Sequence, residues 1–349
     1  MFYLLVCLVA LVITALLTVL VKRIALSQAI VDEPDISKIN SRKIHVQAIP
    51  LLGGLAIFLG YFGLLFFWSD HFLSGNLVLS HLVGFFLGAL VIIIGGILDD
   101  KYNLLPRYQI IFPLLAVAFV ILGGVEITKI SNPLGGFFNF RDLAFFSPYV
   151  IALWLMGMMY TTKLLDGVDG LVSGLGAIGG FIIFLFTITT RYYQPDIAFA
   201  AILLTGAALG FLIFNWHPAK IFLGEGGSIL IGYILGVLAI ISGGKIAIAL
   251  LVMGIPILDV AWTIIRRLAA GRNPFKFSDR QHLHHRLLSL GLGQRMTVVI
   301  FYILSLVFGL SGLFLQSKGK LWALIGLVVI MFLLVISFWI ADRSQSKIN

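Results

Sequence analysis

Long apolar runs alternate with short polar breaks along the whole chain. Each run approaches the roughly 20 residues that a helix needs to cross the hydrocarbon core of a bilayer. Lipid cannot satisfy backbone hydrogen bonds, so such runs indicate helices, and the shorter alternating segments of a membrane β-barrel are absent. The pattern predicts eleven spans, with boundaries good to a few residues. They lie near 1–21, 51–68, 77–98, 109–124, 149–165, 171–190, 198–214, 221–242, 245–265, 297–316 and 320–341.

Composition supports a single integral membrane domain. Hydrophobic residues make up 60% of the 349-residue chain and charged residues 11%, which excludes an ordinary soluble domain. No repeat divides the chain, and the single cysteine, Cys7, excludes an internal disulfide or a cysteine-based zinc site. We therefore expect an all-α polytopic protein over residues 1–349. Its predicted cytoplasmic loops are 22–50, 99–108, 163–170, 215–220 and 266–296.

The placement of positive charge predicts the orientation. No Lys or Arg precedes the first span, whereas Lys22 and Arg23 follow it, which favours an uncleaved anchor with its N-terminus outside. With eleven spans the C-terminus is then cytoplasmic, and 18 of the 24 Lys and Arg fall on the inner side. Topology thus accounts for the net charge of +9, although basic loops also attract anionic lipids and phosphorylated substrates.

Four polar clusters fall in breaks that this orientation places on the cytoplasmic side. The first is Asp99-Asp100, where an apolar run ends in two adjacent carboxylates. Adjacent acids at the edge of lipid are costly unless they hold a metal, pair with a cation or carry a proton. A solvated helix end with Lys101 as partner explains the doublet equally well, so alone it is weak evidence for function.

The second cluster is Asp166-Gly167-Val168-Asp169-Gly170, preceded by Lys163. In a helix, carboxylates three residues apart share one face, and glycines let a ligand or backbone approach closely. A tight polar turn between two spans is the alternative. We consider it the weaker one, because a turn does not require two acids beside a lysine at the edge of the hydrocarbon.

The third cluster, Gly224-Glu225-Gly226-Gly227-Ser228, opens a span after a polar segment that begins at Asn215. Glycines at a helix start expose backbone N–H groups to an anion, and Glu225 offers oxygen to an Mg²⁺ ion shared with a phosphate. The equally good alternative is a capped helix start, with Ser228 or Glu225 near the positive end of the helix dipole.

The fourth cluster is His282-Leu283-His284-His285-Arg286 in the basic loop 266–296. Histidines among arginines favour phosphate oxygens over Zn²⁺ or Ni²⁺, because no nearby carboxylate or cysteine completes a familiar ligand spacing. A solvated basic loop is the alternative. Asp259, an acid inside a predicted span, is either functional or a buried partner between helices.

The order of these motifs resembles one family over nearly the whole chain. Arg42-Lys43-Ile44-His45 and Pro50-Leu51-Leu52-Gly53-Gly54 precede the four clusters. The arrangement resembles the polyprenyl-phosphate N-acetylhexosamine-1-phosphate transferases of glycosyltransferase family 4. The histidine loop and eleven spans look like the WecA and TagO branch. The related MraY branch, which uses UDP-MurNAc-pentapeptide, typically has a different histidine loop and ten spans, and is the alternative within the family.

The resemblance implies an activity and its partners. A UDP-N-acetylhexosamine, by default UDP-GlcNAc, would give its sugar-1-phosphate to undecaprenyl phosphate and release UMP, at the inner face of the cytoplasmic (inner) membrane. This step would initiate synthesis of a cell-envelope glycan. The resemblance also implies Mg²⁺ (or Mn²⁺) as cofactor, membrane lipids as surroundings, no nucleic-acid partner, and compatibility with a homodimer. Phosphoryl transfer depends on charge neutralisation and alignment, which suits the clustered charges.

Residue roles follow from the same resemblance. Asp99 would orient or deprotonate the lipid phosphate with Asp100 beside it, and direct attack is preferred to a covalent aspartyl intermediate. Asp166 and Asp169 complete the expected catalytic acids, and Glu225 with Asp166 would hold the metal. The expected nucleotide- and diphosphate-binding residues are Asn215, Phe222 (stacked on uracil), Lys163, His282, His284, His285 and Arg286. The expected lipid-phosphate-binding residues are Lys43 and His45.

Two residues depart from the family pattern. Lys163 stands where the family usually has Asn, and Glu225 where it has Asp. Glu keeps an oxygen ligand, whereas Lys163 can pair with Asp166, replace a phosphate contact or repel the metal. An inactive homologue is therefore an alternative. A transporter of lipid-linked sugars is disfavoured, because the charges gather on one face rather than at mid-membrane between repeated halves.

Overall fold

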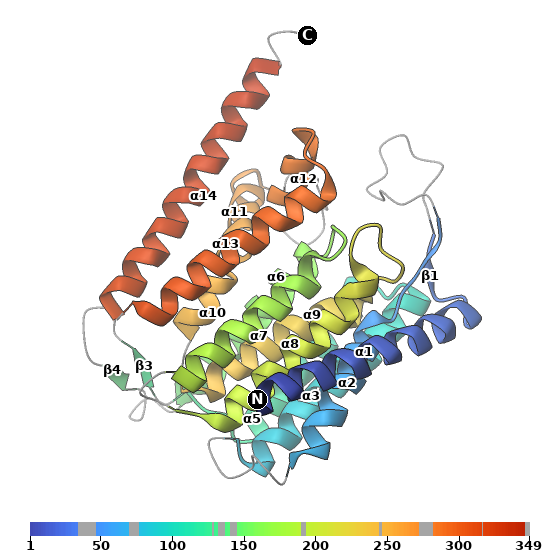
Figure 1. Cartoon of the computed structure of the whole chain (residues 1–349). Coiled ribbons are helices and arrows are strands. Elements are labelled where there is room, and N and C mark those ends of the chain that lie inside the picture. Colours follow the sequence, from blue (N-terminus) through green and yellow to red (C-terminus); the bar gives the residue numbers. More distant parts are fainter. Residues whose placement is uncertain are drawn as a thin grey trace.

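Helices form almost all of the structure, a computed structural model that describes residues 1–33, 47–69, 77–127, 129–131, 137–139, 145–189, 193–243, 246–271, 282–315 and 317–345 (Figure 1). The longer helices are α1 (Phe2–Ser27), α2 (Gly53–Phe67), α3 (Leu79–Tyr102), α5 (Ile111–Leu122), α6 (Ser147–Leu165), α7 (Leu171–Thr189), α8 (Pro195–Asn215), α9 (Gly224–Ile241), α11 (Gly254–Ala269), α13 (Gln294–Phe314) and α14 (Ser317–Gln345). The short ones are α4 (Pro106–Gln109), α10 (Ile246–Val252) and α12 (Leu283–Ser289).

Two small antiparallel pairs accompany the helices. β1 (Val31–Asp32) pairs with β2 (Ile49–Pro50), and β3 (Lys129–Ser131) with β4 (Phe137–Asn139). In Figure 1, β1 and α12 are drawn toward one end of the bundle and the β3–β4 hairpin toward the other. The strands connect helices and do not form a sheet that helices could cover.

The expected helical membrane fold is confirmed. Six helices in the described part of the chain are long and apolar enough to cross a membrane, or seven if α10 and α11 are counted as one span. Each of the apolar runs recognised in the sequence contains at least one helix. Lipid-facing backbone requires hydrogen bonds within its own segment, which explains why apolar composition and helix coincide.

The predicted span 245–265 is not a single continuous helix. The chain breaks at Met253, and α10 and α11 meet at a bend of 81°. α11 begins at Gly254 and carries Pro256 in its first turn. Proline has no N–H to continue the hydrogen bonds of a preceding helix, and glycine resists the bend least, so both residues favour a break here.

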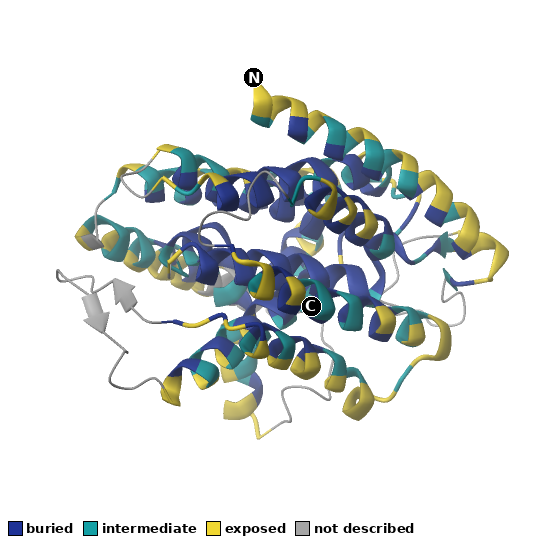
Figure 2. Cartoon of the chain, turned by 90° about the horizontal axis from the view of Figure 1, so that it is seen from below, coloured by how far each residue is buried: buried dark blue, intermediate teal, exposed yellow. Residues whose placement is uncertain are grey.

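α9 lies at the centre of the bundle and packs against α3, α6, α2 and α7. Figure 2 shows the buried interior and the more exposed outer helices, among them the N-terminal one. Glycines permit the close approach at one end of α9. A Cβ at Gly96 would overlap the Cα of Gly226, and one at Gly54 would overlap the Cα of Gly227. Small residues let membrane helices approach at backbone distance, so α2, α3 and the start of α9 meet closely.

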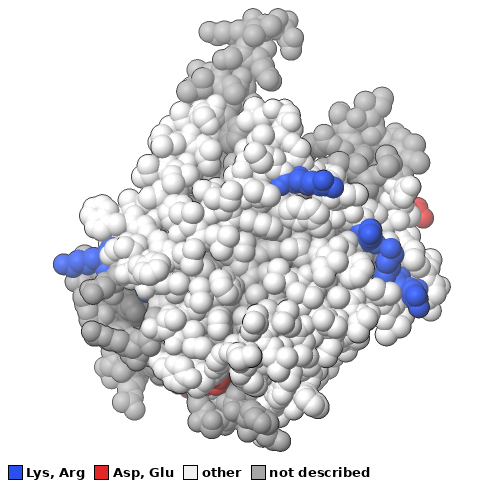
Figure 3. All heavy atoms as spheres, viewed as in Figure 1, with Lys and Arg blue, Asp and Glu red and all other residues white. Residues whose placement is uncertain are grey.

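The outer surface is largely apolar. Large hydrophobic side chains of α1, α13 and α14 are exposed, among them Leu16, Ile303 and Phe332. Figure 3 shows a broad uncharged face on which Lys and Arg occupy only a few places. Such a surface suits hydrocarbon rather than water.

Candidate active site

The end of α3 and the start of α9 are joined by a hydrogen bond between two of the acidic motifs. The backbone N–H of Glu225 donates to Oδ1 of Asp100 over 3.0 Å. Gly224, directly before it, has φ +74°, and a Cβ there would overlap the Asp100 carboxylate. The start of α9 does face an anion, as the glycines suggested, but that anion is the side chain of Asp100.

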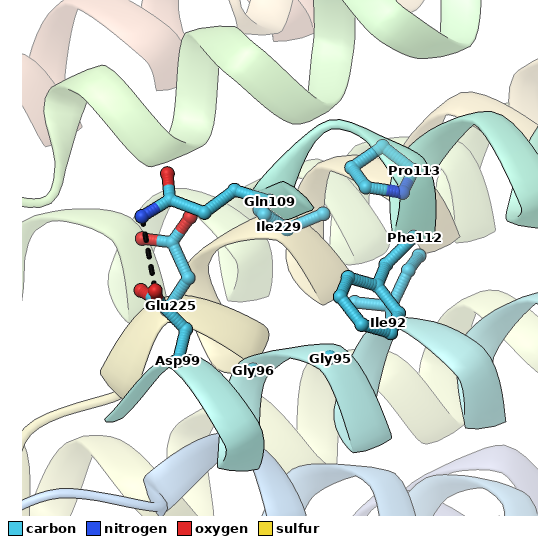
Figure 4. A pocket seen from close by; sticks show the side chains of 9 residues that line it. All are labelled: Ile92, Gly95, Gly96, Asp99, Gln109, Phe112, Pro113, Glu225 and Ile229. Atoms are coloured by element: carbon cyan, nitrogen blue, oxygen red, sulfur yellow. Dashed lines mark hydrogen bonds between the residues drawn. The ribbon is translucent and has the colours of Figure 1, made fainter. Parts of the chain in front are cut away.

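Asp99 points to a different set of partners. Its Oδ1 accepts hydrogen bonds from the backbone N–H of Leu104 at 2.8 Å and from Nε2 of Gln109 at 2.9 Å (Figure 4). Gln109 is itself held because Nε2 also donates to the carbonyl of Leu104. Lys101, the alternative partner considered for the doublet, instead lies over the ring of Tyr102. The two adjacent carboxylates therefore have separate surroundings.

Gln109 was not among the predicted site residues. Together with Asp99 and Glu225 it forms the polar end of a cleft between α3, α5 and α9 (Figure 4). The remaining lining residues are Ile92, Gly95, Gly96, Phe112, Pro113 and Ile229. The available signal was a polar residue at the start of an apolar run, shortly after the Asp doublet, but such residues are common at helix ends.

Lys163 connects the acidic motifs. Its ammonium group forms an ion pair with Oε1 of Glu225 and donates a hydrogen bond of 3.0 Å to Oε1 of Gln109. Of the roles that the sequence left open for this cation, pairing with a carboxylate is observed, and its partner is Glu225 rather than Asp166. Asp99, Gln109, Lys163 and Glu225 thus form one connected polar chain.

The segment 166–170 is a turn, which is the alternative that the sequence left open, so Asp166 and Asp169 do not share a helix face. α6 ends at Leu165, and Gly170 has φ +80°. Oδ2 of Asp169 turns toward the next loop, where it pairs with Nδ1 of His217 at 2.7 Å and accepts the N–H of Ala219 at 3.1 Å. Gly170, directly before α7, adopts a positive φ that residues with a side chain rarely adopt.

Asp166 faces the other acids. It lies at an exposed position directly after α6. The surrounding protein and then the negative charges of Glu225, Asp100 and Asp169 raise the pKa of the Asp166 carboxyl above its ordinary value. The hydrogen bond between Asp100 and Glu225 and the ion pair between Lys163 and Glu225 show that motifs far apart in the sequence meet in one place.

Asn215 holds two loops together. Its Oδ1 accepts the N–H of Gly170 at 3.1 Å and the hydroxyl of Ser173 at 2.9 Å, while its Nδ2 donates to the carbonyl of Ile221 at 3.0 Å. The buried amide therefore positions the 166–170 turn against the segment before α9. A nucleotide contact by Asn215, as the resemblance implied, stays a prediction. The hydroxyl of Tyr302 adds a further bond to the Gly170 carbonyl, at 2.5 Å, that the sequence did not indicate.

The histidine loop is anchored by Asp259. This carboxylate is buried in α11 and accepts from Nδ1 of His282 and from the N–H of Leu283, both at 2.9 Å. Asp259 is thus a buried partner, one of the two readings of an acid inside a span. It fixes α12 to the bent α10–α11 segment and so positions the histidines that follow.

His284 is buried with both ring nitrogens lacking a hydrogen-bond partner in the described structure. Burial, and then the neighbouring His285 and His282, hold the pKa of His284 well below its ordinary value, so the ring is neutral. A Cβ at Gly167 would lie 3.0 Å from Nε2 of His284, which places this ring against the Asp-rich turn. Among the described residues, the buried imidazole thus lacks the hydrogen-bond partner that a buried polar group normally has.

The remaining predicted residues are placed as follows. His285 and Arg286 are half-buried on α12, and the His285 ring centroid is 4.3 Å from that of His284. Phe222 is half-buried, and its backbone is bonded to Pro50 and Gly53 at the start of α2. Lys43 and His45 lie outside the described residues.

The acidic side chains at this site are of the type that binds a hard divalent cation. Asp166, Asp100 and Glu225 offer carboxylate oxygens, which Mg²⁺ prefers. Lys163 already neutralises Glu225, however. Among the described residues, no three acidic, histidine or cysteine side chains converge on one ion position.

Comparison with known proteins identifies the family. The sequence profile of glycosyl transferase family 4 matches residues 82–243, which include the Asp doublet, the Asp-rich turn and Glu225. The chain is 32% identical over 348 residues to a probable undecaprenyl-phosphate N-acetylglucosaminyl 1-phosphate transferase of Bacillus subtilis, covering 98% of this chain and 91% of that protein.

Two other relatives cover somewhat less. A decaprenyl-phosphate N-acetylglucosaminephosphotransferase of Mycobacterium tuberculosis (strain CDC 1551 / Oshkosh) is 32% identical over 323 residues, 83% of this chain and 79% of that protein. A phospho-N-acetylmuramoyl-pentapeptide-transferase of Halalkalibacterium halodurans is 31% identical over 287 residues, 76% of this chain and 83% of that protein. By the extent of these matches, the chain belongs to glycosyl transferase family 4.

Proposed function

We propose that this protein transfers N-acetylglucosamine 1-phosphate from UDP-N-acetylglucosamine to undecaprenyl phosphate. The observation that carries the proposal is the convergence of Asp99, Asp100, Asp166, Glu225 and the orphaned His284 at the same end of the bundle. Relatives that match over most of the chain are named for transfer of N-acetylglucosamine phosphate to a polyprenyl phosphate.

The reaction balances as one displacement. An oxygen of undecaprenyl phosphate attacks the phosphorus that carries the sugar, the bond from that phosphorus to the bridging oxygen breaks, and UMP leaves with the electron pair. Asp99, fixed through Oδ1 by Leu104 and Gln109, orients the attacking phosphate or takes its proton. His284 donates one hydrogen bond to the diphosphate, because a neutral imidazole carries a single N–H.

Positive charge is needed where the diphosphate sits. Lys163, His285 and Arg286 are the expected cationic and hydrogen-bonding groups around it. The carboxylates of Asp166 and Glu225 would hold an Mg²⁺ ion, with Mn²⁺ as a substitute, which when bound supplies neutralisation of the diphosphate charge.

The proposal includes an orientation. Eleven spans with the N-terminus outside place the site on the cytoplasmic face of the inner membrane. Two observations support it: the excess of Lys and Arg in the loops assigned to that side, and the contacts that bring the acidic and histidine motifs to the same end of the bundle.

Release of UMP tests the proposal. The purified protein in detergent is incubated with Mg²⁺, undecaprenyl phosphate and UDP-N-acetylglucosamine, and Asp99→Asn serves as the inactive control. We expect UMP release that depends on the lipid and is lost in the variant. The relative from Halalkalibacterium halodurans, which is named for muramoyl-pentapeptide transfer, motivates UDP-MurNAc-pentapeptide as the second donor. Turnover with that donor alone would reassign the substrate, and no turnover with any UDP-sugar would favour an inactive homologue.

A further inference from the structure

The Lys163–Glu225 ion pair is built into the ends of two helices. Lys163 lies in the last turn of α6 and Glu225 in the first turn of α9, and both side chains are 19% exposed. A cation at a helix C-terminus and an anion at a helix N-terminus are each stabilised by the helix dipole. Gln109 adds a third contact by accepting from the ammonium group. The pair is therefore well stabilised without any ligand.

Glu225, the anionic member of the pair, also has a proposed role in metal binding. Glu225 is one of the acids proposed to hold a divalent cation, and Lys163 neutralises it directly. The pair also joins the two departures from the family pattern, Lys for Asn and Glu for Asp. An asparagine amide carries no charge to compete with a metal, and the additional methylene of Glu extends its carboxylate further from the α9 backbone. The two residues that depart from the pattern of the resembled family therefore contact each other.

Building on the proposed function, we propose that Lys163 is an exchangeable counter-cation: it competes with the divalent cation for Glu225 and passes to the diphosphate when the nucleotide sugar binds. Lys163 can make this exchange because its stem is flexible and its ammonium group donates in three directions. His284, buried and without a partner in the described structure, marks a nearby place where such a ligand is expected.

The exchange predicts two effects of opposite sign in Lys163→Met. Without nucleotide, removal of the ammonium frees Glu225, so the variant should bind Mn²⁺ at least tenfold more tightly, measured by electron paramagnetic resonance of free Mn²⁺. With EDTA present, the variant should bind UDP at least fivefold more weakly, measured by calorimetry. Lys101→Met is the matched control, because it removes one charge from an exposed side chain in the last turn of α3. It should change neither affinity more than twofold.

A merely structural role of Lys163 gives a different pattern. Damage to the site would weaken both Mn²⁺ and UDP binding, and that result overturns the proposal, as does Mn²⁺ affinity within twofold of the unaltered protein. Lys163→Gln keeps a polar side chain beside Gln109 and is the second test variant in case Lys163→Met unfolds. It should show the same two changes, tighter Mn²⁺ binding and weaker UDP binding. Opposite changes in both variants support the exchange.

The outcome is separable from that of the transferase assay, because neither binding measurement requires turnover. If the wild-type protein releases UMP and Lys163→Met binds Mn²⁺ with unchanged affinity, the proposed exchange is wrong and the proposed transferase activity stands. Opposite shifts in the two affinities without any UMP release support the exchange in a nucleotide site, and only the proposed transfer fails.

Discussion

Asp100 caps the helix that begins with Gly224 and Glu225. Its Oδ1 accepts the backbone N–H of Glu225, although 125 positions separate the two residues in the chain. Asp99, its neighbour, is held instead by Leu104 and Gln109. The two carboxylates therefore have different roles. Asp100 fixes the start of α9, and Asp99 is oriented within the cleft.

Gly224→Ala should disrupt this cap. A residue with a Cβ is strained by about 1–2 kcal/mol at a φ of +74°, and the new methyl group would overlap the Asp100 carboxylate. We expect a lower midpoint of thermal unfolding and at least a tenfold loss of UMP release. Gly243→Ala is the control, because it has φ +83° but no atom within 4 Å of the new Cβ. Equal losses in both variants would show that backbone strain, not the Asp100 contact, is responsible.

Gln109→Leu should lower kcat with little change in stability. The substitution removes the donor to Asp99 and the acceptor for Lys163 while it preserves side chain size. Groups that orient a reacting side chain are worth about 10–100-fold, so we expect a fall in kcat of this order. Gln28→Leu, at an exposed position after α1, is the control. Unchanged kcat in Gln109→Leu would remove Gln109 from the site.

Substitutions at Asp259 should detach the histidine loop. Asp259→Ala leaves the buried ring of His282 and the N–H of Leu283 without their acceptor, at a cost of about 1–3 kcal/mol for each group. We expect KM for the UDP-sugar to rise and the unfolding midpoint to fall. Asp259→Asn keeps one oxygen for Leu283 and should lie between Asp259→Ala and the wild type. If all three proteins share one KM, the anchor does not position the diphosphate-binding residues.

The neutral state of His284 predicts sensitivity to acid. Burial and the neighbouring histidines hold its pKa in the folded protein well below the ordinary 6.5. Below pH 6.5 the unfolded chain therefore binds more protons at this residue, and the free energy of unfolding falls as pH falls. His284→Gln does not titrate, so its unfolding midpoint should drop less between pH 7.5 and pH 5.5. A drop in the unfolding midpoint of His284→Gln as large as that of the wild type would contradict the prediction.

The helices, and the end of the bundle at which the polar motifs lie, could be predicted from the sequence. The helices depend on the local composition of each apolar run, and the placement of the motifs depends on the number of runs between them. A run of apolar residues in lipid has little alternative to a helix, whichever helices surround it. The parity of spans then predicted that Asp99, Asp166, Glu225 and His284 would lie at one end, and their contacts confirm that they do. The bend at Met253 was missed because the pattern of apolar residues continues through it.

What each polar side chain contacts was decided only by tertiary structure. The sequence suggested Asp166, three positions away, as a partner of Lys163, whereas the structure pairs Lys163 with Glu225 on another helix. It could not show that Asn215 joins two loops or that Asp259 anchors His282. Hydrogen bonds and ion pairs act over a few ångströms, so partners depend on how helices pack, whereas apolar periodicity acts along the chain and is already present in its order of residues.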